Sequence, residues 1–361
     1  MTATIKDVAQ RAKVATSTAS MVLRQRPSAL ISEATRQRVL EAARELNYRP
    51  NLSARSLRSR KTFVVGMVMT RLRWHDCLEL AYPVEEFFRA HDYHVITGFS
   101  NADALEERRY VEEMTNGRVD GVMVQPVRTL NPSVLEFYET MDFPIVLLDG
   151  PDGTRLPSVK KNRQEGIVLA VRHLYSLGRR HIGLGIVSPR PSYFSGKERL
   201  EGYRRVLEEL GLPYEEELLL SGGSSPDYFK DGRELAADVV AHMPPMDAII
   251  CANDVYAIGL MQGLAERGVK VPEDISVMGF TNLAASEYQS IPLTTIDHNH
   301  ELIARTAAQM LWDLMCWPEG EAPPEPVTIV VPPRLVVRES CGARLFGYLP
   351  ENAVPLPKTG S

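Results

Sequence analysis

The chain after residue 61 alternates short apolar segments with amphipathic stretches, and this alternation constrains the fold more than any other feature. Apolar segments of strand length lie at 62–69, 94–99, 121–125, 145–149, 182–187, 248–251 and 275–279. Helical patterns lie between them at 82–91, 106–115, 165–177, 198–210, 232–241, 255–268 and 302–314. Near-continuous apolar strands that alternate with helices are typical of parallel sheets covered by helices on both faces.

This region is too long for one such sheet, so we expect two lobes. The segment 293–296, followed by a helix, predicts a return into the first lobe. A strand at 327–331 would cross back again. No apolar run is long enough to span a bilayer, and the N-terminus lacks the apolar core of a signal peptide, so we expect a cytoplasmic protein.

Charge is segregated along the chain. The 41 basic and 46 acidic residues give a net charge of −5, which by itself argues against a nucleic-acid partner. However, the first 61 residues hold 13 of the basic and only four of the acidic residues, so this part carries +9 and the remainder −14. A basic head on an acidic body is typical of a DNA-binding domain joined to a carrier domain. The alternative is a solvated basic arm without a ligand.

The first 50 residues predict three short helices. Each begins after a residue that can cap it: Thr4 before 5–12, Thr16 before 17–23 and Ser32 before 33–46. The first two helices are separated by a short turn, which predicts a helix-turn-helix. The next segment, 51–58, forms barely two helical turns, so we expect it to be disordered alone and to fold on DNA.

These residues carry a family resemblance. TIKDVAQRAKVATSTASMVLR (4–24) and SEATRQRVLEAARELNYRP (32–50) resemble the headpiece of the lactose-repressor (LacI/GalR) family, and NLSARSLR (51–58) resembles its hinge helix. Motifs similar to those of the family follow in the same order: HLYSLGRRHIG (173–183), KERLEGY (197–203), CANDVYAIG (251–259), DISVMGF (274–280), IPLTTI (291–296) and PRLVVRES (333–340).

The expected fold class is therefore an N-terminal all-α helix-turn-helix headpiece plus an α/β two-lobed, periplasmic-binding-protein-like (type I) effector domain with parallel sheets. The expected parts are a headpiece at 1–50, a hinge at 51–61, an effector and dimerisation domain at 62–340 and a tail at 341–361. Within the effector domain, we expect 62–163 and 294–325 in the first lobe, and 164–293 and 326–340 in the second. The tail is too short and too rich in proline for a tetramerising coiled coil.

The resemblance implies which residues contact operator DNA. They are Thr4, Thr16, Ser17, Thr18 and Met21 in the headpiece, and Asn51, Ala54, Arg55, Leu57 and Arg58 in the hinge. Leu57 would wedge into a minor-groove base step, although it could instead be a linker leucine packed on the body. Two departures stand out: Lys13 occupies the usual glycine of the turn, and Met21 replaces an arginine. Methionine can touch a thymine methyl but cannot read guanine.

The resemblance also implies a ligand site between the lobes. Its residues would be Arg199, Asn253, Phe280, Thr281, Trp74, Asp76, Asp149 and His300. Some have an ordinary structural alternative: Arg199 could form a surface ion pair, and His300 could simply begin a helix. Asp254 could cap the helix that follows it. Thr281 stands where many sugar-binding members have an aspartate, which makes a common hexose less certain as the ligand.

The expected function is a DNA-binding transcriptional regulator, most simply a repressor. It would bind a palindromic operator as a homodimer under the control of a sugar-like effector, and it would associate with the nucleoid when bound to operator. A small-molecule-binding module with a basic tether is the main alternative, and an enzyme on the same scaffold is a remote third. The sequence His298-Asn299-His300 lacks the surroundings of a nuclease metal site. The four cysteines form no CxxC pair. We therefore expect no metal, no cofactor and no catalytic residues.

Overall fold

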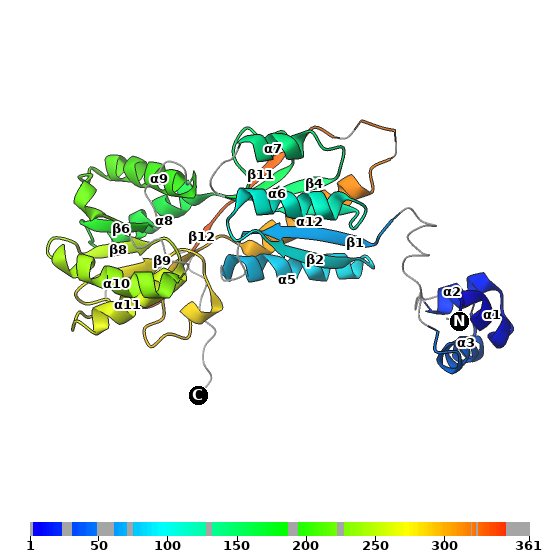
Figure 1. Cartoon of the computed structure of the whole chain (residues 1–361). Coiled ribbons are helices and arrows are strands. Elements are labelled where there is room, and N and C mark those ends of the chain that lie inside the picture. The colour runs from blue at the N-terminus through cyan, green and yellow to red at the C-terminus, as the bar shows by residue number, and fades with distance from the viewer. Residues whose placement is uncertain are drawn as a thin grey trace. The chain divides into compact units, whose positions relative to one another are not determined.

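Three short helices form the N-terminal part of the computed structural model, which describes residues 3–23, 31–48, 61–70, 75–127, 132–186, 194–221, 227–318, 320–322 and 324–343. The chain divides into two units, Met1–Thr62 and Phe63–Ser361. The first contains α1 (Ile5–Ala12), α2 (Thr16–Leu23) and α3 (Glu33–Glu45) (Figure 1). Its small core takes side chains from all three helices: Val8, Ala9, Ala12, Ala19, Val22, Val39, Ala42 and Ala43.

The helix ends of this unit follow the sequence with one exception. Thr4 and Asp7 form a capping box: the Asp7 amide donates to the Thr4 hydroxyl over 3.4 Å, and the Thr4 amide donates to the Asp7 carboxylate over 2.7 Å. Ser32 accepts from the Thr35 amide over 3.3 Å. The prediction that Thr16 caps the second helix is wrong, because α2 begins at Thr16 itself and the Ala19 amide already donates to the Ala15 carbonyl.

The second unit contains two six-stranded sheets. The first has the strand order β11-β5-β4-β3-β1-β2 and the second β12-β10-β9-β8-β6-β7. Among the described residues, every strand pairing is parallel except that of β10 with β12. The strands are β1 (Val64–Met69), β2 (His94–Phe99), β3 (Gly121–Val124), β4 (Ile145–Leu148), β5 (Ser158–Lys161), β6 (Ile182–Ile186), β7 (Leu219–Ser221), β8 (Ala248–Cys251), β9 (Ser276–Gly279), β10 (Thr294–Asp297), β11 (Thr328–Val331) and β12 (Arg334–Val336).

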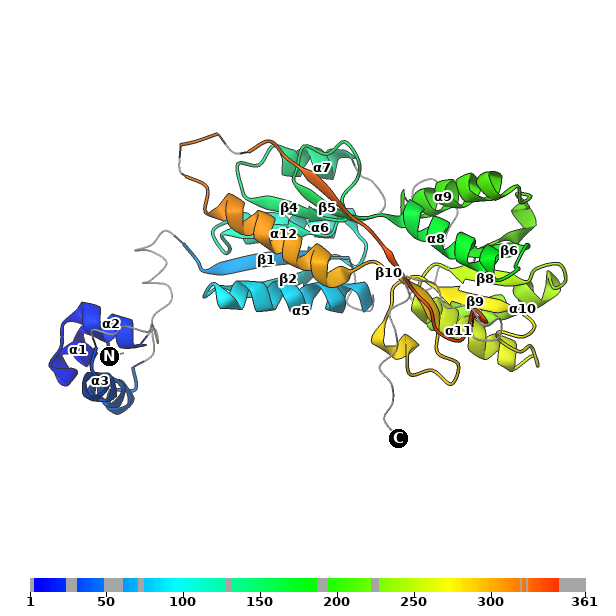
Figure 2. The ribbon, with the colours of Figure 1, turned by 180° about the vertical axis from the view of Figure 1, so that it is seen from behind.

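Helices cover both faces of each sheet, and each sheet has an apolar core on either side. The first lobe has α5 (His75–Ala90) and α12 (His300–Met315) on one face, and α6 (Ala104–Thr115) and α7 (Pro132–Glu139) on the other. In the second lobe, α8 (Arg163–Ser176) and α9 (Phe194–Leu210) lie opposite α10 (Tyr228–Ala241) and α11 (Asp254–Ala265) (Figure 2). Short 3-10 turns lie at Glu216–Leu218 and Ala284–Ser286. The predicted two-lobed α/β architecture is confirmed.

The chain passes between the sheets at different points from those predicted. We expected 294–325 in the first lobe and 326–340 in the second. Instead, β10 lies in the second sheet and β11 in the first. The passages therefore follow β5, β10 and β11. The reason is pairing: β10 is parallel to β9 and antiparallel to β12, whereas β11 is parallel to β5.

The structure also contains elements that the apolar pattern did not predict. They are β5, β7, β12 and α7. The most informative is β5, whose sequence Ser-Val-Lys-Lys does not look like a buried strand. All four of its residues are nevertheless buried, including Lys160 and Lys161. Lys160 is buried 3.7 Å from the carboxylate of Glu198.

Candidate DNA-contacting and ligand-binding sites

The second helix of the N-terminal unit has one packed face and one open face. Ala19 and Val22 are buried against the other two helices, whereas Thr16, Ser17 and Met21 are exposed and Thr18 is half-buried. An exposed hydroxyl can reach base edges or phosphates, and the methionine can reach a thymine methyl. The predicted contact residues of this helix therefore lie on its accessible side.

The turn before this helix is tight and left-handed. Lys13 has φ 56° and ψ 50°, and the Val14 amide donates to the Ala9 carbonyl over 3.0 Å. Left-handed angles at the end of a helix favour glycine, so the lysine is a strained substitute, as the sequence suggested. Thr4, at the other end of α1, is exposed, and its hydroxyl donates to Asp7 over 2.8 Å. The amide and hydroxyl of Thr4 lower the pKa of the Asp7 carboxyl.

Several predicted contact residues lie outside the described part of the chain. These are the hinge residues Asn51, Ala54, Arg55, Leu57 and Arg58, and also Trp74. Asp76 lies within α5, but its side chain is likewise outside the described residues.

In the second lobe, the structure brings Arg199, Phe280 and two histidines together. The Arg199 guanidinium lies 4.9 Å from the centre of the Phe280 ring, and its Nη2 donates to the Ala252 carbonyl over 3.0 Å. The His298 ring stands edge-on to Phe280 at 4.9 Å, and His300 lies 6.0 Å further on. Phe280 can press against α8 because Gly166 has no Cβ, which would come within 2.7 Å of the ring. The cluster joins α8 and α9 to the ends of β9 and β10.

Asn253 and Thr281 lie beside this cluster and also have structural roles. The Asn253 side chain caps α11 by accepting from the Tyr256 amide over 2.9 Å. The possibility that Asp254 caps this helix is therefore wrong, because Asn253 fills that role. The Thr281 hydroxyl accepts from the Asp254 amide over 3.2 Å.

Asp254 organises the loop on which Phe280 and Thr281 lie. Its fully buried carboxylate accepts five hydrogen bonds, from the amides of Phe280, Thr281 and Leu283 and the hydroxyls of Ser286 and Thr295, over 2.5–3.0 Å. Hydrogen bonding of this kind is what allows a carboxylate to be buried. These hydrogen bonds thus hold the segment 280–295 against the start of α11.

Asp149 does not join the Arg199 cluster directly. It follows β4 with φ 65°, is almost fully buried, and forms a bidentate ion pair with Arg163 at the start of α8. Sequence reasoning missed Arg163, Glu198, Lys160 and His298 as residues near the expected cleft. The one signal for Glu198 was its position next to Arg199 in the segment KERLEGY; charged residues such as Lys160 and Arg163 are ordinarily expected at the surface.

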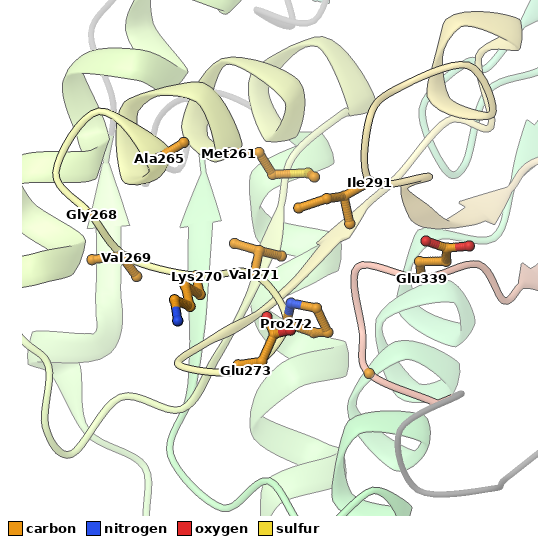
Figure 3. A pocket seen from close by; sticks show the side chains of 11 residues that line it. Met261, Ala265, Gly268, Val269, Lys270, Val271, Pro272, Glu273, Ile291 and Glu339 are labelled. Atoms are coloured by element: carbon orange, nitrogen blue, oxygen red, sulfur yellow. The ribbon is translucent and has the colours of Figure 1, made fainter.

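A hollow of about 740 Å³ lies elsewhere in the second lobe (Figure 3). Its wall is formed by the end of α11, the loop before β9, Ile291 and the segment after β12. Lys270, Glu273 and Glu339 supply its charged side chains. None of the predicted ligand residues that the structure describes lines it, so it is separate from the Arg199 cluster.

Comparison with known proteins gives a consistent result. Residues 4–51 match the model of bacterial regulatory proteins of the lacI family, and residues 171–341 match a periplasmic binding protein-like domain. The HTH-type transcriptional repressor PurR of Pasteurella multocida is 31% identical over 95% of this chain and 100% of its own length. PurR of Vibrio parahaemolyticus is 34% identical over 86% of this chain and 91% of its own.

Solved structures of transcriptional regulators have a similar fold. The lac repressor dimer bound to operator and the anti-inducer ONPF is 26% identical, with a TM-score of 0.77, covering 94% of this chain and 99% of that one. The complex of the transcriptional regulator CelR with cellobiose is also 26% identical, with a TM-score of 0.67 and the same coverage. Within the described residues, no helix is long and apolar enough to cross a membrane.

Proposed function

Because the chain belongs to the LacI family of bacterial regulatory proteins, and is thus a DNA-binding transcriptional repressor rather than an enzyme, we propose that it binds a palindromic operator as a homodimer and responds to a sugar-like effector. The observation that carries the operator proposal is the open face of α2, with Thr16, Ser17 and Met21 exposed opposite buried Ala19 and Val22. Thr4, exposed at the start of α1, and half-buried Thr18 would add further contacts. The hinge residues Asn51, Ala54, Arg55, Leu57 and Arg58 would add minor-groove and phosphate contacts. Its place of action would be the cytoplasm, on the nucleoid while the operator is occupied.

A homodimer is supported by an exposed apolar surface on the first lobe. Leu78 and Tyr82, which lie one turn apart on α5, are 56% and 68% exposed. Adjacent exposed apolar side chains of this size often mark a protein interface. A two-fold axis through this surface would pair two headpieces with two operator half-sites.

The proposed effector site is the Arg199 cluster. A guanidinium can hold two oxygens of a sugar or a carboxylate at once, and contact with the Phe280 ring and the Ala252 carbonyl fixes its position. Asn253, Thr281 and His300 would supply further polar groups, and Trp74 and Asp76 would complete the site from the first lobe. Asp149 would act through its ion pair with Arg163. Effector binding would release DNA if the effector is an inducer, and tighten DNA binding if it is a corepressor.

The deciding experiment is selection of duplexes from a random pool by the full-length protein, followed by affinity measurements at several salt concentrations. We expect palindromic sites, at least ~1,000-fold preference over random DNA and steep weakening with salt. Equal affinity for selected and random duplexes would contradict the operator proposal and favour a ligand-binding module with a basic tether.

A further inference from the structure

Five charged side chains form a largely buried chain of ion pairs where the first lobe meets the second. Arg163, at the start of α8, pairs with Asp149 on the first-lobe side and donates to Glu198 of α9 over 2.9 Å. Lys160 of β5 lies 2.5 Å from Asp152 and 3.7 Å from the other oxygen of Glu198. Asp149, Asp152 and Lys160 belong to the first lobe, whereas Arg163 and Glu198 belong to the second.

Burial makes these contacts dependent on one another. The side chains of Arg163, Asp149 and Lys160 are only 1%, 4% and 5% exposed, and that of Glu198 is 16% exposed, whereas Asp152 is 88% exposed and forms the solvent end of the chain of ion pairs. Burial disfavours the charge of Arg163, but the carboxylates of Asp149 and Glu198 outweigh it and raise its pKa. A buried charge that loses its partner is strongly unfavourable. Separation of the lobes at this point would therefore break favourable pairs unless water or other ions replaced them.

Glu198 is also the immediate neighbour of Arg199 in α9. The two side chains reach different groups: Glu198 contacts Arg163 and Lys160, while Arg199 contacts Ala252 and Phe280. The first turns of α9 are thus attached both to the junction between the lobes and to the proposed ligand cluster. A displacement of α9 at Arg199 would therefore also move Glu198 and strain its ion pairs with Arg163 and Lys160.

We infer that Glu198 and Arg163 are positioning residues: they clamp α9 to the first lobe through Asp149 and Lys160, and thereby fix the spacing of the lobes for the residue that binds effector. This inference rests on the proposed effector site for its biological purpose. The clamp itself is a property of the protein without DNA or effector, and it is tested without either.

The experiment measures distances between spin labels on the two lobes of the full-length protein. Labels are attached at Glu136→Cys on α7 and Ala237→Cys on α10, which are exposed positions. The exposed native thiol is removed by Cys316→Ser, while the other three cysteines are buried. Glu198→Gln keeps the shape of the side chain and removes its charge. The matched control is Glu201→Gln, because Glu201 also links α9 to α8, through Gln164 over 2.8 Å, but makes this link at the surface within one lobe.

We expect Glu198→Gln to shift or broaden the distance distribution, and Glu201→Gln to leave it unchanged. Asp149→Asn tests the clamp from the first-lobe end, and asparagine tolerates the left-handed backbone of this position. It should give the same change, which also covers the case in which Glu198→Gln fails to fold. A folded Glu198→Gln or Asp149→Asn protein whose distribution superimposes on that of Glu201→Gln would overturn the clamp. Failure to find an operator or an effector would affect only the proposed function.

Discussion

Lys13 shows how a single residue can carry a local conformational cost. Its φ of 56° lies in the left-handed region, where a residue with a Cβ is disfavoured relative to glycine. The packing of α1 and α2 around Ala9, Ala12 and Ala19 requires the tight turn, so the fold retains the strained angle. Replacement by glycine should therefore relieve the strain.

We expect Lys13→Gly to stabilise the headpiece by about 1 kcal/mol. The measurement is hydrogen exchange of the α1 amides, which reports the local opening free energy. Lys6→Gly is the matched control: it lies inside α1, where glycine should destabilise by a similar amount. Faster exchange in Lys13→Gly than in the wild type would contradict the assignment of strain to this turn.

Arg199 is the residue on which the effector proposal depends most. An effector is first sought by thermal-shift screening of sugars, sugar acids and nucleobases. Arg199→Ala should abolish the response to it, because the guanidinium that holds the ligand oxygens is lost. At 100 times its dissociation constant, a ligand stabilises the wild type by ~2.7 kcal/mol, and this shift should disappear. Affinity for operator without effector should be retained. Arg205→Ala, an exposed arginine of the same helix, is the control. A normal dose response in Arg199→Ala would remove the arginine from the site.

At the scale of elements, α5 carries two large exposed side chains, Leu78 and Tyr82, on the surface of the first lobe. Tyr82 is 68% exposed, so its replacement should leave the fold intact. The same helix contacts α12 through a solvent-exposed ion pair between Glu86 and Arg305 at 2.5 Å. The arrangement suits association with a second copy.

Tyr82→Glu should weaken the dimer by about 2 kcal/mol or more, roughly 30-fold in Kd. A carboxylate in place of the ring would lose its hydration on association and would stand near Glu79 and Glu86, while Arg305 is already paired with Glu86 and Glu301. Sedimentation velocity over a range of concentrations measures the change. Tyr288→Glu is the control, since Tyr288 is 81% exposed in a second-lobe loop. If Tyr82→Glu remained as dimeric as Tyr288→Glu, this face would not be the interface.

At the scale of the whole molecule, His173 links stability to pH. It is buried in α8, with Nε2 3.3 Å from the Cys341 sulfur, and burial lowers its pKa to about 4. In the unfolded chain a histidine titrates near 6.5, so the unfolded state binds more protons between pH 6.5 and 4. The contribution of His173 to the free energy of unfolding is therefore fully present above pH 6.5. It is lost as the pH falls toward 4, by about 3 kcal/mol in total.

Glu107 acts in the opposite direction. Burial raises the pKa of Glu107 to about 7, although hydrogen bonds from the Val127 amide and the Tyr138 hydroxyl oppose the shift. Below pH 7 the folded state therefore binds this proton more readily than the unfolded chain, and the contribution of Glu107 to stability increases as the pH falls. A comparison of variants separates the two effects. The free energy of unfolding of His173→Gln should fall less between pH 7 and pH 4 than that of the wild type. His242→Gln, at a solvent-exposed hydrogen bond at the end of α10, should follow the wild type. Equal slopes in all three proteins would refute the role of His173.

Local sequence signals determined much of this molecule. The capping residues Thr4 and Ser32, the alternation of strands and helices, and the separation of basic head from acidic body all follow from neighbours within a few residues. The pattern failed at β5, because Lys160 and Lys161 break the apolar run. It also misplaced β10 and β11, because sheet membership depends on which distant strand offers a pairing edge.

Only the tertiary structure decided what the buried ions do. Asp149 and Arg163 are 14 residues apart, Arg163 and Glu198 are 35 apart, and Asp254 and Thr295 are 41 apart. From the sequence alone, a charged residue is expected at the surface, because its burial is favourable only when partners and hydrogen bonds surround it. Those partners come from separate strands and helices. The sequence therefore determined most of the elements and the family, whereas the folded structure decided that Asp149 is the partner of an arginine at the junction of the lobes.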